Sequence, residues 1–175
     1  TPEHVLDDDT TADLYEVAIE SLAASGWTHY EIANWAREPR FASQHNLVYW
    51  RGHEYAGIGP GAHGRLDIAG ERRATATERR PEAWLMRVEA LGHGVVTDET
   101  LSHVEIADEF LMMGLRLAEG IDPARYEQLA GRPIDERRVA ILREEGAVEV
   151  TPEGRLRVTQ SGFPVLDAVV ADLAA

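Results

Sequence analysis

His45, Tyr49 and Trp50 are the residues whose types and spacing suggest chemistry most directly. They lie between residues 30 and 64, a stretch that holds three of the seven histidines and five of the fifteen glycines. An imidazole beside two aromatic rings could sit at the mouth of a wall suited to a flat hydrophobic ligand. Alternatively, Tyr49 and Trp50 pack against a helix predicted over residues 10–25. The residues alone leave both interpretations open.

The spacing of the histidines argues against a metal centre. His45, His53 and His63 are separated by eight and ten residues, which matches neither a helical pair of ligands nor a zinc knuckle. The chain has no cysteine, which excludes disulfides, thiolate ligands and thiol nucleophiles within it. We therefore predict no zinc site, and His45 is the one histidine that we assign to a candidate site.

The glycine-rich segment 57–64 formally contains the pattern G-x-G-x-x-G, at residues 59–64. A dinucleotide-binding loop of this kind must open a helix, so that the helix N-terminus meets the pyrophosphate. The residues that follow Gly64 are polar and show no helical periodicity. We predict a glycine turn that needs positive φ angles or close backbone approach, with a ligand-facing loop as the alternative.

The carboxylates and serines do not form a recognisable catalytic set. Glu31 and Asn34 fall on opposite faces of a strand predicted over residues 29–35, so they cannot face one pocket unless the strand bulges. No serine sits in a nucleophile elbow. The sequence thus predicts neither a two-carboxylate hydrolase nor a serine hydrolase.

The composition is that of an acidic globular protein. The 175 residues carry a formal charge of −14, and all seventeen basic residues are arginines. Such a balance disfavours nucleic acid as a partner, because phosphate binding needs clustered cations. No apolar run approaches the roughly 20 residues that span a bilayer. We expect no stable membrane insertion and a cytoplasmic location.

The elements that must position these residues begin with a helix from Thr10. Its start resembles a capping box, Thr10 to Asp13, and Gly26 is placed to end it. An apolar stripe follows one face of this helix: Leu14, Val17, Ala18 and Leu22. The elements expected next are the strand 29–35, a loop over 37–44, a short strand over 54–59, a hairpin or irregular connection over 65–80 turning at Gly70, and a helix over 81–91 ended by Gly92 and Gly94.

The pattern of predicted elements changes near residues 92–98, which suggests a domain boundary there. The elements expected after it are a long helix over 98–118 capped by Gly120, helices over 123–130 and 135–144, strands over 147–151 and 155–158, and a helix over 160–173. This layout is typical of a winged-helix-like unit. Residues 97–175 hold eight arginines against sixteen acidic residues, so a packing or lid module is favoured over a DNA-binding wing.

Several motifs together resemble the oxygen-independent coproporphyrinogen III oxidase-like radical SAM proteins, and specifically the HemW-type haem chaperones. The similar segments are Tyr30-Glu31-Ile32-x-Asn34-Trp35-Ala36, His45-Asn46-x-x-Tyr49-Trp50, Gly57-Ile58-Gly59-Pro60-Gly61-Ala62-His63-Gly64 and Met113-Gly114-Leu115-Arg116-Leu117-x-Glu119-Gly120-Ile121. The second of these looks like the element that separates the haem chaperones from true coproporphyrinogen oxidases. The resemblance covers the whole chain, which corresponds to about the second half of such a protein.

The resemblance implies an α/β fold, or α+β for this portion alone. Residues 1–92 would form the last strands of a partial (β/α) radical SAM barrel with a connecting segment, and residues 93–175 a mostly helical, winged-helix-like domain. In such proteins, the C-x-x-x-C-x-x-C motif that holds a [4Fe–4S] cluster and S-adenosylmethionine lies in the N-terminal half, which this chain does not include. This chain alone is therefore not expected to be an enzyme. The open barrel edge predicts marginal solubility, a missing N-terminal segment or a homodimer.

The resemblance also implies residue roles. His45, Asn46, Tyr49 and Trp50 would belong to a haem-binding element, with His45 the candidate ligand of the haem iron, and Ala36 would lie near S-adenosylmethionine in a complete protein. The family commonly has Arg where Gln44 stands, so a propionate partner would be lost. The partners implied are haem and haem-acceptor proteins. Two alternatives stay open, namely that the parent is a coproporphyrinogen III oxidase of porphyrin biosynthesis, or that the chain is a non-catalytic interaction module.

Overall fold

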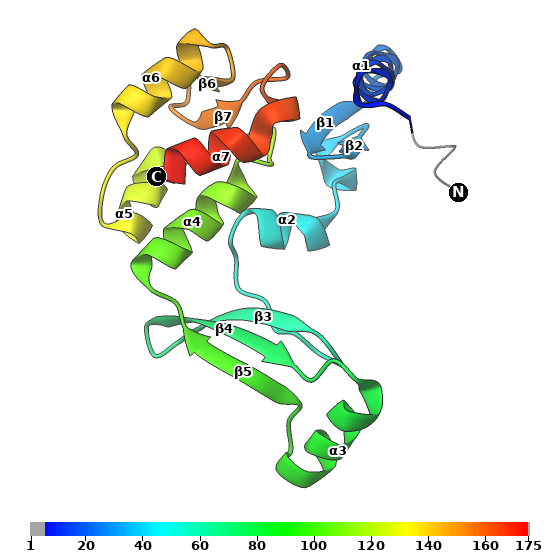
Figure 1. Ribbon diagram of the computed structural model, residues 1–175, viewed down its shortest axis with the longest axis vertical. Coiled ribbons are helices and arrows are strands. Elements are labelled where there is room, and N and C mark those ends of the chain that lie inside the picture. The colour runs from blue at the N-terminus through cyan, green and yellow to red at the C-terminus, as the bar shows by residue number, and fades with distance from the viewer. Residues whose placement is uncertain (1–5, 175) are drawn as a thin grey trace. The chain divides into compact units, whose positions relative to one another are not determined.

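The computed structural model describes residues 6–174, which fall into two compact units (Figure 1). The first unit ends at Ser43 and the second begins at Gln44. Each is described by itself below. The division into domains at residues 92 and 93 follows the family resemblance and stays a prediction.

The first unit opens with helix α1, Asp8–Ala24. Its N-cap is Asp7, whose side chain accepts a hydrogen bond from the Thr10 N–H at 2.8 Å. The helix therefore begins two residues before the predicted start at Thr10, because Asp7 and not Thr10 is its N-cap. Gly26 follows the helix with φ +76°, which confirms the predicted end.

A hairpin follows α1, where we predicted a single strand over residues 29–35. Strands β1 (Thr28–Glu31) and β2 (Asn34–Ala36) pair antiparallel, with an irregular register between His29 and Glu31. The turn places Ala33 at φ +68°, a conformation that glycine or asparagine usually supplies. The sequence does not predict this turn, because neither glycine nor asparagine occupies position 33. A short 3₁₀ helix, Pro39–Phe41, follows.

The hairpin also overturns the prediction that Glu31 and Asn34 point apart. The two residues are cross-strand partners, and the Asn34 side-chain amide donates to a Glu31 carboxylate oxygen. Glu31 is fully buried. The prediction failed because it assumed uninterrupted strand alternation between positions that lie on either side of a chain reversal.

The second unit begins with helix α2 (Gln44–Trp50) and a three-stranded antiparallel sheet in the order β3-β4-β5. The strands are β3 (His63–Ile68), β4 (Glu71–Thr77) and β5 (Val95–Thr100), and helix α3 (Pro81–Leu91) connects the last two. The predicted turn at Gly70 and the helix 81–91 with its Gly92 cap are confirmed. The strand expected over 54–59 is only an isolated bridge between Tyr55 and Arg65.

The long helix predicted over 98–118 was wrong at both ends. Helix α4 is His103–Gly114, and the residues before it form β5, which pairs with β4. Ser102 caps α4 in a reciprocal capping box with Glu105. Gly120 is no helix cap either. It has φ +66°, and a Cβ there would collide with the Leu156 carbonyl oxygen, because the chain passes against β7 at this point.

The C-terminal part of the second unit has the predicted winged-helix-like layout. Its elements are α5 (Pro123–Ala130), α6 (Glu136–Glu144), β6 (Val148–Val150), β7 (Leu156–Val158), a 3₁₀ turn (Phe163–Val165) and α7 (Leu166–Ala174). Ile121 bridges to Leu156 on the other side of β7 from β6, with two backbone hydrogen bonds of 2.8 and 2.9 Å. The last helix begins at 166 rather than 160.

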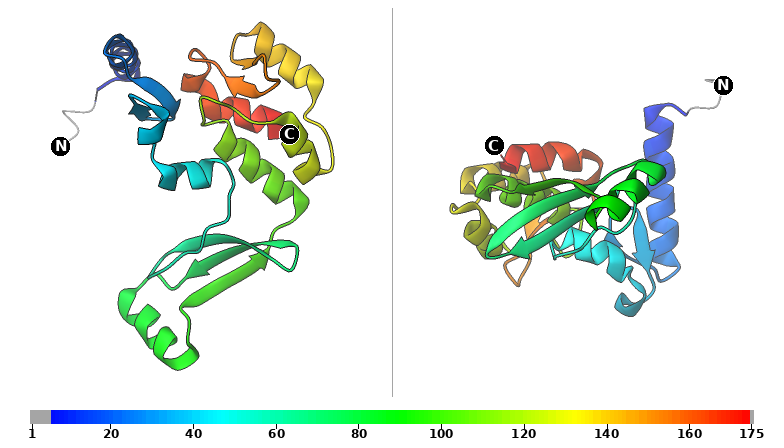
Figure 2. Two further views of the ribbon diagram at one scale, coloured as in Figure 1. Left: turned by 180° about the vertical axis from the view of Figure 1, so that it is seen from behind. Right: turned by 90° about the horizontal axis from the view of Figure 1, so that it is seen from below.

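The core of the second unit lies around α4, which packs against both α5 and α7. The left view of Figure 2 shows α7 alongside α4. The fully buried side chains of this core include Leu111, Leu115, Ile121, Tyr126 and Leu173. Within residues 6–174, no helix is both long and apolar enough to cross a membrane.

Candidate functional site

Helix α2 presents His45 and Tyr49 on one face, because residues four apart in a helix lie above one another. The Tyr49 hydroxyl lies 3.2 Å from His45 Nε2, and the two rings meet edge to face with centroids 4.8 Å apart. His45 itself is exposed. The helix therefore holds an accessible imidazole in one orientation through a neighbour on the next turn.

Trp50 leaves α2 in a different direction from Tyr49, as adjacent helical residues do. The guanidinium carbon of Arg116 lies 5.9 Å from the Trp50 ring centroid, and the Trp50 indole nitrogen is buried with no hydrogen-bond partner among the described residues. The next aromatic ring beyond Tyr49 is Tyr55, with centroids 4.5 Å apart. The aromatic neighbours of His45 are thus Tyr49 and then Tyr55.

The two other residues of the predicted sites occupy contrasting positions. Asn46 is half-buried on α2, one residue from His45. Ala36 is buried at the end of β2, in the first unit. The roles that the family resemblance implies for these two residues stay predictions.

The glycine segment 57–64 is a hydrogen-bonded turn that leads into strand β3. Gly59 and Gly61 have φ angles of +101° and +69°, as a glycine turn requires. The Gly61 N–H donates to the Glu78 carbonyl oxygen at 2.8 Å, and the Ala62 N–H to the Thr77 hydroxyl at 2.9 Å. These two N–H groups are committed to the residues at the end of β4, so the turn is fastened to the sheet and they are not free to cradle a phosphate.

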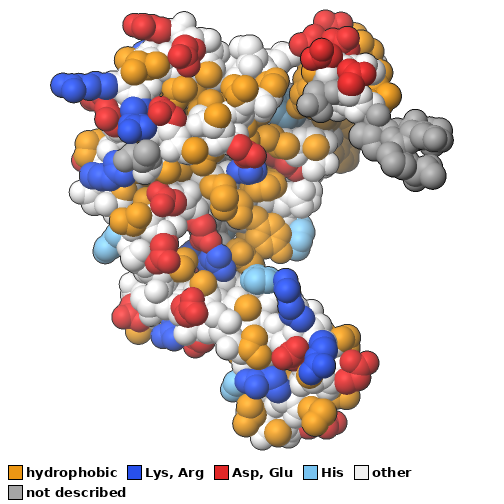
Figure 3. All heavy atoms as spheres, in the orientation of Figure 1, with side chains coloured by type: hydrophobic (Ala, Val, Ile, Leu, Met, Phe, Trp, Pro, Cys, Tyr) orange, Lys and Arg blue, Asp and Glu red, His pale blue; other side chains and the backbone are white. Residues whose placement is uncertain are grey.

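A cleft of about 540 Å³ lies within the second unit, between the segment after α2, the β3–β4 hairpin, and helices α4 and α5. Tyr49 and Tyr55 line it, so the aromatic pair beside His45 continues into this cleft. Sequence reasoning missed the cleft, because its lining residues come from segments far apart in the chain and no local motif shows that these segments are in contact. Figure 3 shows acidic and basic side chains close together over α4 and the sheet.

Ion pairs fix the hairpin side of the cleft. Arg65 on β3 binds both carboxylate oxygens of Glu109 on α4 through its Nε atom, at 2.8 and 3.0 Å. This hydrogen bonding raises the pKa of Arg65 above its ordinary value. Burial raises the pKa of the neighbouring Tyr55 hydroxyl, so Tyr55 is neutral at physiological pH.

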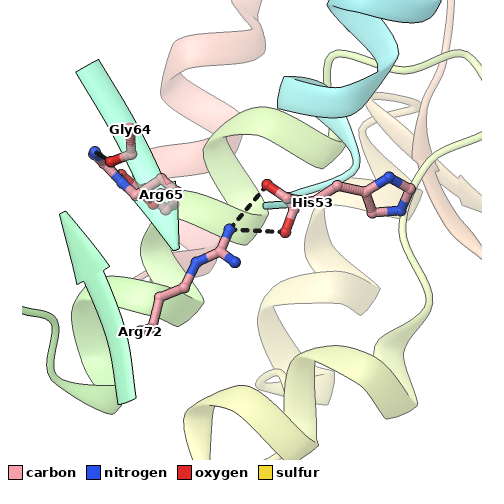
Figure 4. A network of polar contacts seen from close by, with 6 residues as sticks. His53, Gly64, Arg65 and Arg72 are labelled. Atoms are coloured by element: carbon pink, nitrogen blue, oxygen red, sulfur yellow. Dashed lines mark hydrogen bonds and ion pairs between the residues drawn. The ribbon is translucent and has the colours of Figure 1, made fainter. Parts of the chain in front are cut away.

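Arg72 on β4 also lines the cleft and is held by hydrogen bonds. Its Nη2 atom donates to the carbonyl oxygens of Gly52 and His53 at 2.9 and 3.1 Å, and the His53 ring points away from it (Figure 4). Its Nη1 atom donates to Asp67 at 3.2 Å. These bonds tie the segment after α2 to the hairpin, so two of the segments that line the cleft are held together.

Comparison with known proteins places these elements in a family. Residues 101–165, from the residue after β5 to the turn before α7, match the HemN C-terminal domain. The heme chaperone HemW of Mycobacterium tuberculosis H37Rv is 32% identical over 167 residues, covering 95% of this chain and 40% of that protein. The chain is a homologue of the HemW proteins and carries a HemN C-terminal domain.

The same relationship extends to proteins named mitochondrial radical S-adenosyl methionine domain-containing protein 1. That of Bos taurus is 32% identical over 177 residues, covering 95% of this chain and 40% of the relative. That of Danio rerio is 41% identical over 124 residues, covering 69% and 28%. The chain thus spans well under half the length of these curated relatives.

A solved structure shows the same fold for this HemW homologue. Coproporphyrinogen III oxidase (HemN) of Escherichia coli, a radical SAM enzyme, superposes over 100% of this chain and 43% of its own, with a TM-score of 0.71 and 15% identity. The predicted fold class, barrel strands followed by a winged-helix-like domain, is confirmed by these matches.

The residues present do not fit the iron–sulfur cluster that the family name implies. Such clusters are held by cysteine thiolates, and this chain contains no cysteine. Among residues 6–174, no three histidine, aspartate or glutamate side chains converge as a metal site. No step of radical chemistry is therefore assigned to these residues.

Proposed function

We propose that the chain is a haem-binding portion of a radical SAM haem chaperone, and that His45 ligates the haem iron. The observation that carries this proposal is the exposed His45 imidazole, held at Nε2 by the Tyr49 hydroxyl on the next turn of α2. The HemW relatives bear the printed name of heme chaperone, which supports the same assignment.

Each residue would have a role in this proposal. In the tautomer whose Nε2–H donates to the Tyr49 hydroxyl, Nδ1 would be the nitrogen left for iron, and a hydrogen bond on the second nitrogen fixes the tautomer of other metal-ligating histidines in this way. Tyr49 and Tyr55 would offer ring edges to the macrocycle. Asn46 and Trp50 lie on the same helix and would complete the haem-binding element.

An exposed ligand suits a protein that must pass its cargo on. His45 lies at the first turn of α2, so an acceptor protein could approach the bound haem without unfolding the site. Gln44 beside it is exposed and uncharged, so it would contribute no ion pair to a haem propionate. Haem-acceptor proteins and a cytoplasmic location remain part of the proposal, and the named relatives include mitochondrial as well as bacterial proteins.

Titration of the purified chain with haem tests the proposal. A shift of the Soret band is expected on binding, and His45→Ala should abolish it or weaken binding at least tenfold, because the iron loses its protein ligand. His93→Ala, an exposed histidine in the loop after α3, is the matched control and should bind as the unmodified chain does. An absent Soret shift, or one that His45→Ala leaves unchanged, would contradict His45 ligation.

A further inference from the structure

The apolar wall of the cleft is formed by side chains of α4 and α5. Ile106, Phe110 and Met113 project from α4, and Leu129 adds to them from α5. The β3–β4 hairpin and the segment after α2 supply most of the cleft's charged residues. A volume of about 540 Å³ lies within the range of small-molecule sites, about 300–1,000 Å³.

The carboxylates that line the cleft are already engaged. Glu109 holds Arg65, Asp67 accepts from Arg72 at 3.2 Å, and a Glu54 oxygen accepts from the Asp67 N–H at 2.6 Å. A cationic ligand would have to break one of these contacts. The lining therefore offers no uncommitted carboxylate to a positively charged group.

The arginines of the cleft differ from the carboxylates in this respect. Arg51, Arg65 and Arg72 are each paired with an acidic side chain. Arg125 on α5 has no carboxylate within 4.0 Å among residues 6–174, and its Nη1 atom donates a long hydrogen bond, 3.5 Å, to the Gln128 side-chain oxygen. Among residues 6–174, Arg125 is therefore the arginine of the cleft whose guanidinium has no carboxylate partner. It lies one helical turn from Leu129 of the apolar wall.

We propose that this cleft binds a flat, largely apolar acid, with its carboxylate on Arg125 and its ring system against Phe110 and Met113. An arginine fork matches a carboxylate in shape and charge, and aromatic and thioether side chains suit a planar ring. The choice of porphyrins as the ligand class rests on the proposed function. The cleft shares Tyr49 and Tyr55 with the haem element, but its existence does not rest on that proposal, because His45 is not among its lining residues and binding there needs no iron.

Metal-free protoporphyrin IX is the probe, since it carries two carboxylates and cannot be ligated through iron. Quenching of protein fluorescence should report binding to the whole chain. Arg125→Gln should weaken binding about tenfold, because a charge-assisted contact is lost. Arg143→Gln is the matched control, an exposed arginine in the last turn of α6, and should bind as the unmodified chain does.

Two further binding measurements distinguish this site from the haem-binding element of α2. The dimethyl ester of protoporphyrin IX, which lacks free carboxylates, should bind the unmodified chain as weakly as the acid binds Arg125→Gln. His45→Ala should bind the acid normally, even if it no longer binds haem. The proposal is overturned if the unmodified chain does not bind the acid, if Arg125→Gln or esterification leaves the affinity unchanged, or if His45→Ala abolishes binding of the metal-free acid.

Discussion

Helices α1 and α4 carry similar apolar patterns but differ in what covers them. α1 packs against β1 in the first unit, while its stripe residues Leu14 and Val17 are 53% and 57% exposed. α4 packs against α5 and α7, and its Leu111 has no exposed surface. An apolar stripe therefore reports that a helix can pack on one face, whereas the amount of burial depends on the elements around it.

The sharpest way to test this comparison is to shorten one side chain on each helix. Leu111→Ala should lower the free energy of unfolding by about 2–5 kcal/mol, because it removes buried methyl groups and leaves a cavity. Val17→Ala should change it by no more than about 0.5 kcal/mol, since the side chain is mostly in solvent. Urea denaturation followed by far-UV circular dichroism measures both, and equal losses would contradict the contrast.

A second test concerns two glycines of the winged-helix part that share a positive φ but differ in their surroundings. Gly146→Ala should cost about 1 kcal/mol, because φ is +75° but nothing lies within 4 Å of the added Cβ. Gly120→Ala should cost about 2–3 kcal/mol, because the Cβ also meets the backbone of β7. The two unfolding midpoints in urea decide this, and a smaller loss at Gly120 than at Gly146 would refute the packing explanation.

The smallest expected effect is a pH dependence at the start of α4. Hydrogen bonds from the Ser102 N–H and hydroxyl hold the pKa of Glu105 below its ordinary 4.5. Since the folded-state pKa is lowered, the stabilising contact is complete above pH 4.5 and is lost as the pH falls through the lower, folded-state pKa. The amide NMR shift of Ser102 should follow this titration.

Glu105→Gln supplies the control for that titration, because glutamine keeps a hydrogen-bond acceptor at the same position without a titrating carboxyl group. The Ser102 amide shift in this variant should show no transition in the same pH range. A transition with a midpoint at or above 4.5 in the unmodified chain would show that the capping contact does not favour the charged form.

Local signals in the sequence were enough to locate several elements. The helices predicted over 123–130 and 135–144 match α5 and α6 within one residue, because Asp122 and Asp135 cap them and Gly131 ends the first. The turn at Gly70 and the helix begun by Pro81 were found for the same reason. Caps, prolines and positive-φ glycines act within a few residues, so the sequence displays them directly.

Errors occurred where distant pairing decided the structure. Residues 95–100 form β5 because β4 supplies hydrogen-bond partners, although the sequence from residue 98 also continues the helical pattern of α4. The reversal between Glu31 and Asn34 likewise depends on pairing of β1 with β2, at a turn without glycine. Strand propensity depends on such partners more than helix propensity does.

By itself, the sequence determined the acidic character, the absence of thiolate ligands, the motifs of the HemW resemblance, and the C-terminal helices. Only the tertiary structure decided that Trp50 meets Arg116, and that Arg125 has no carboxylate partner among residues 6–174 while the other arginines of the cleft are paired. The physical reason is that residue types and local spacing fix what each segment can do. Which side chains are paired depends on contacts between segments far apart in the chain.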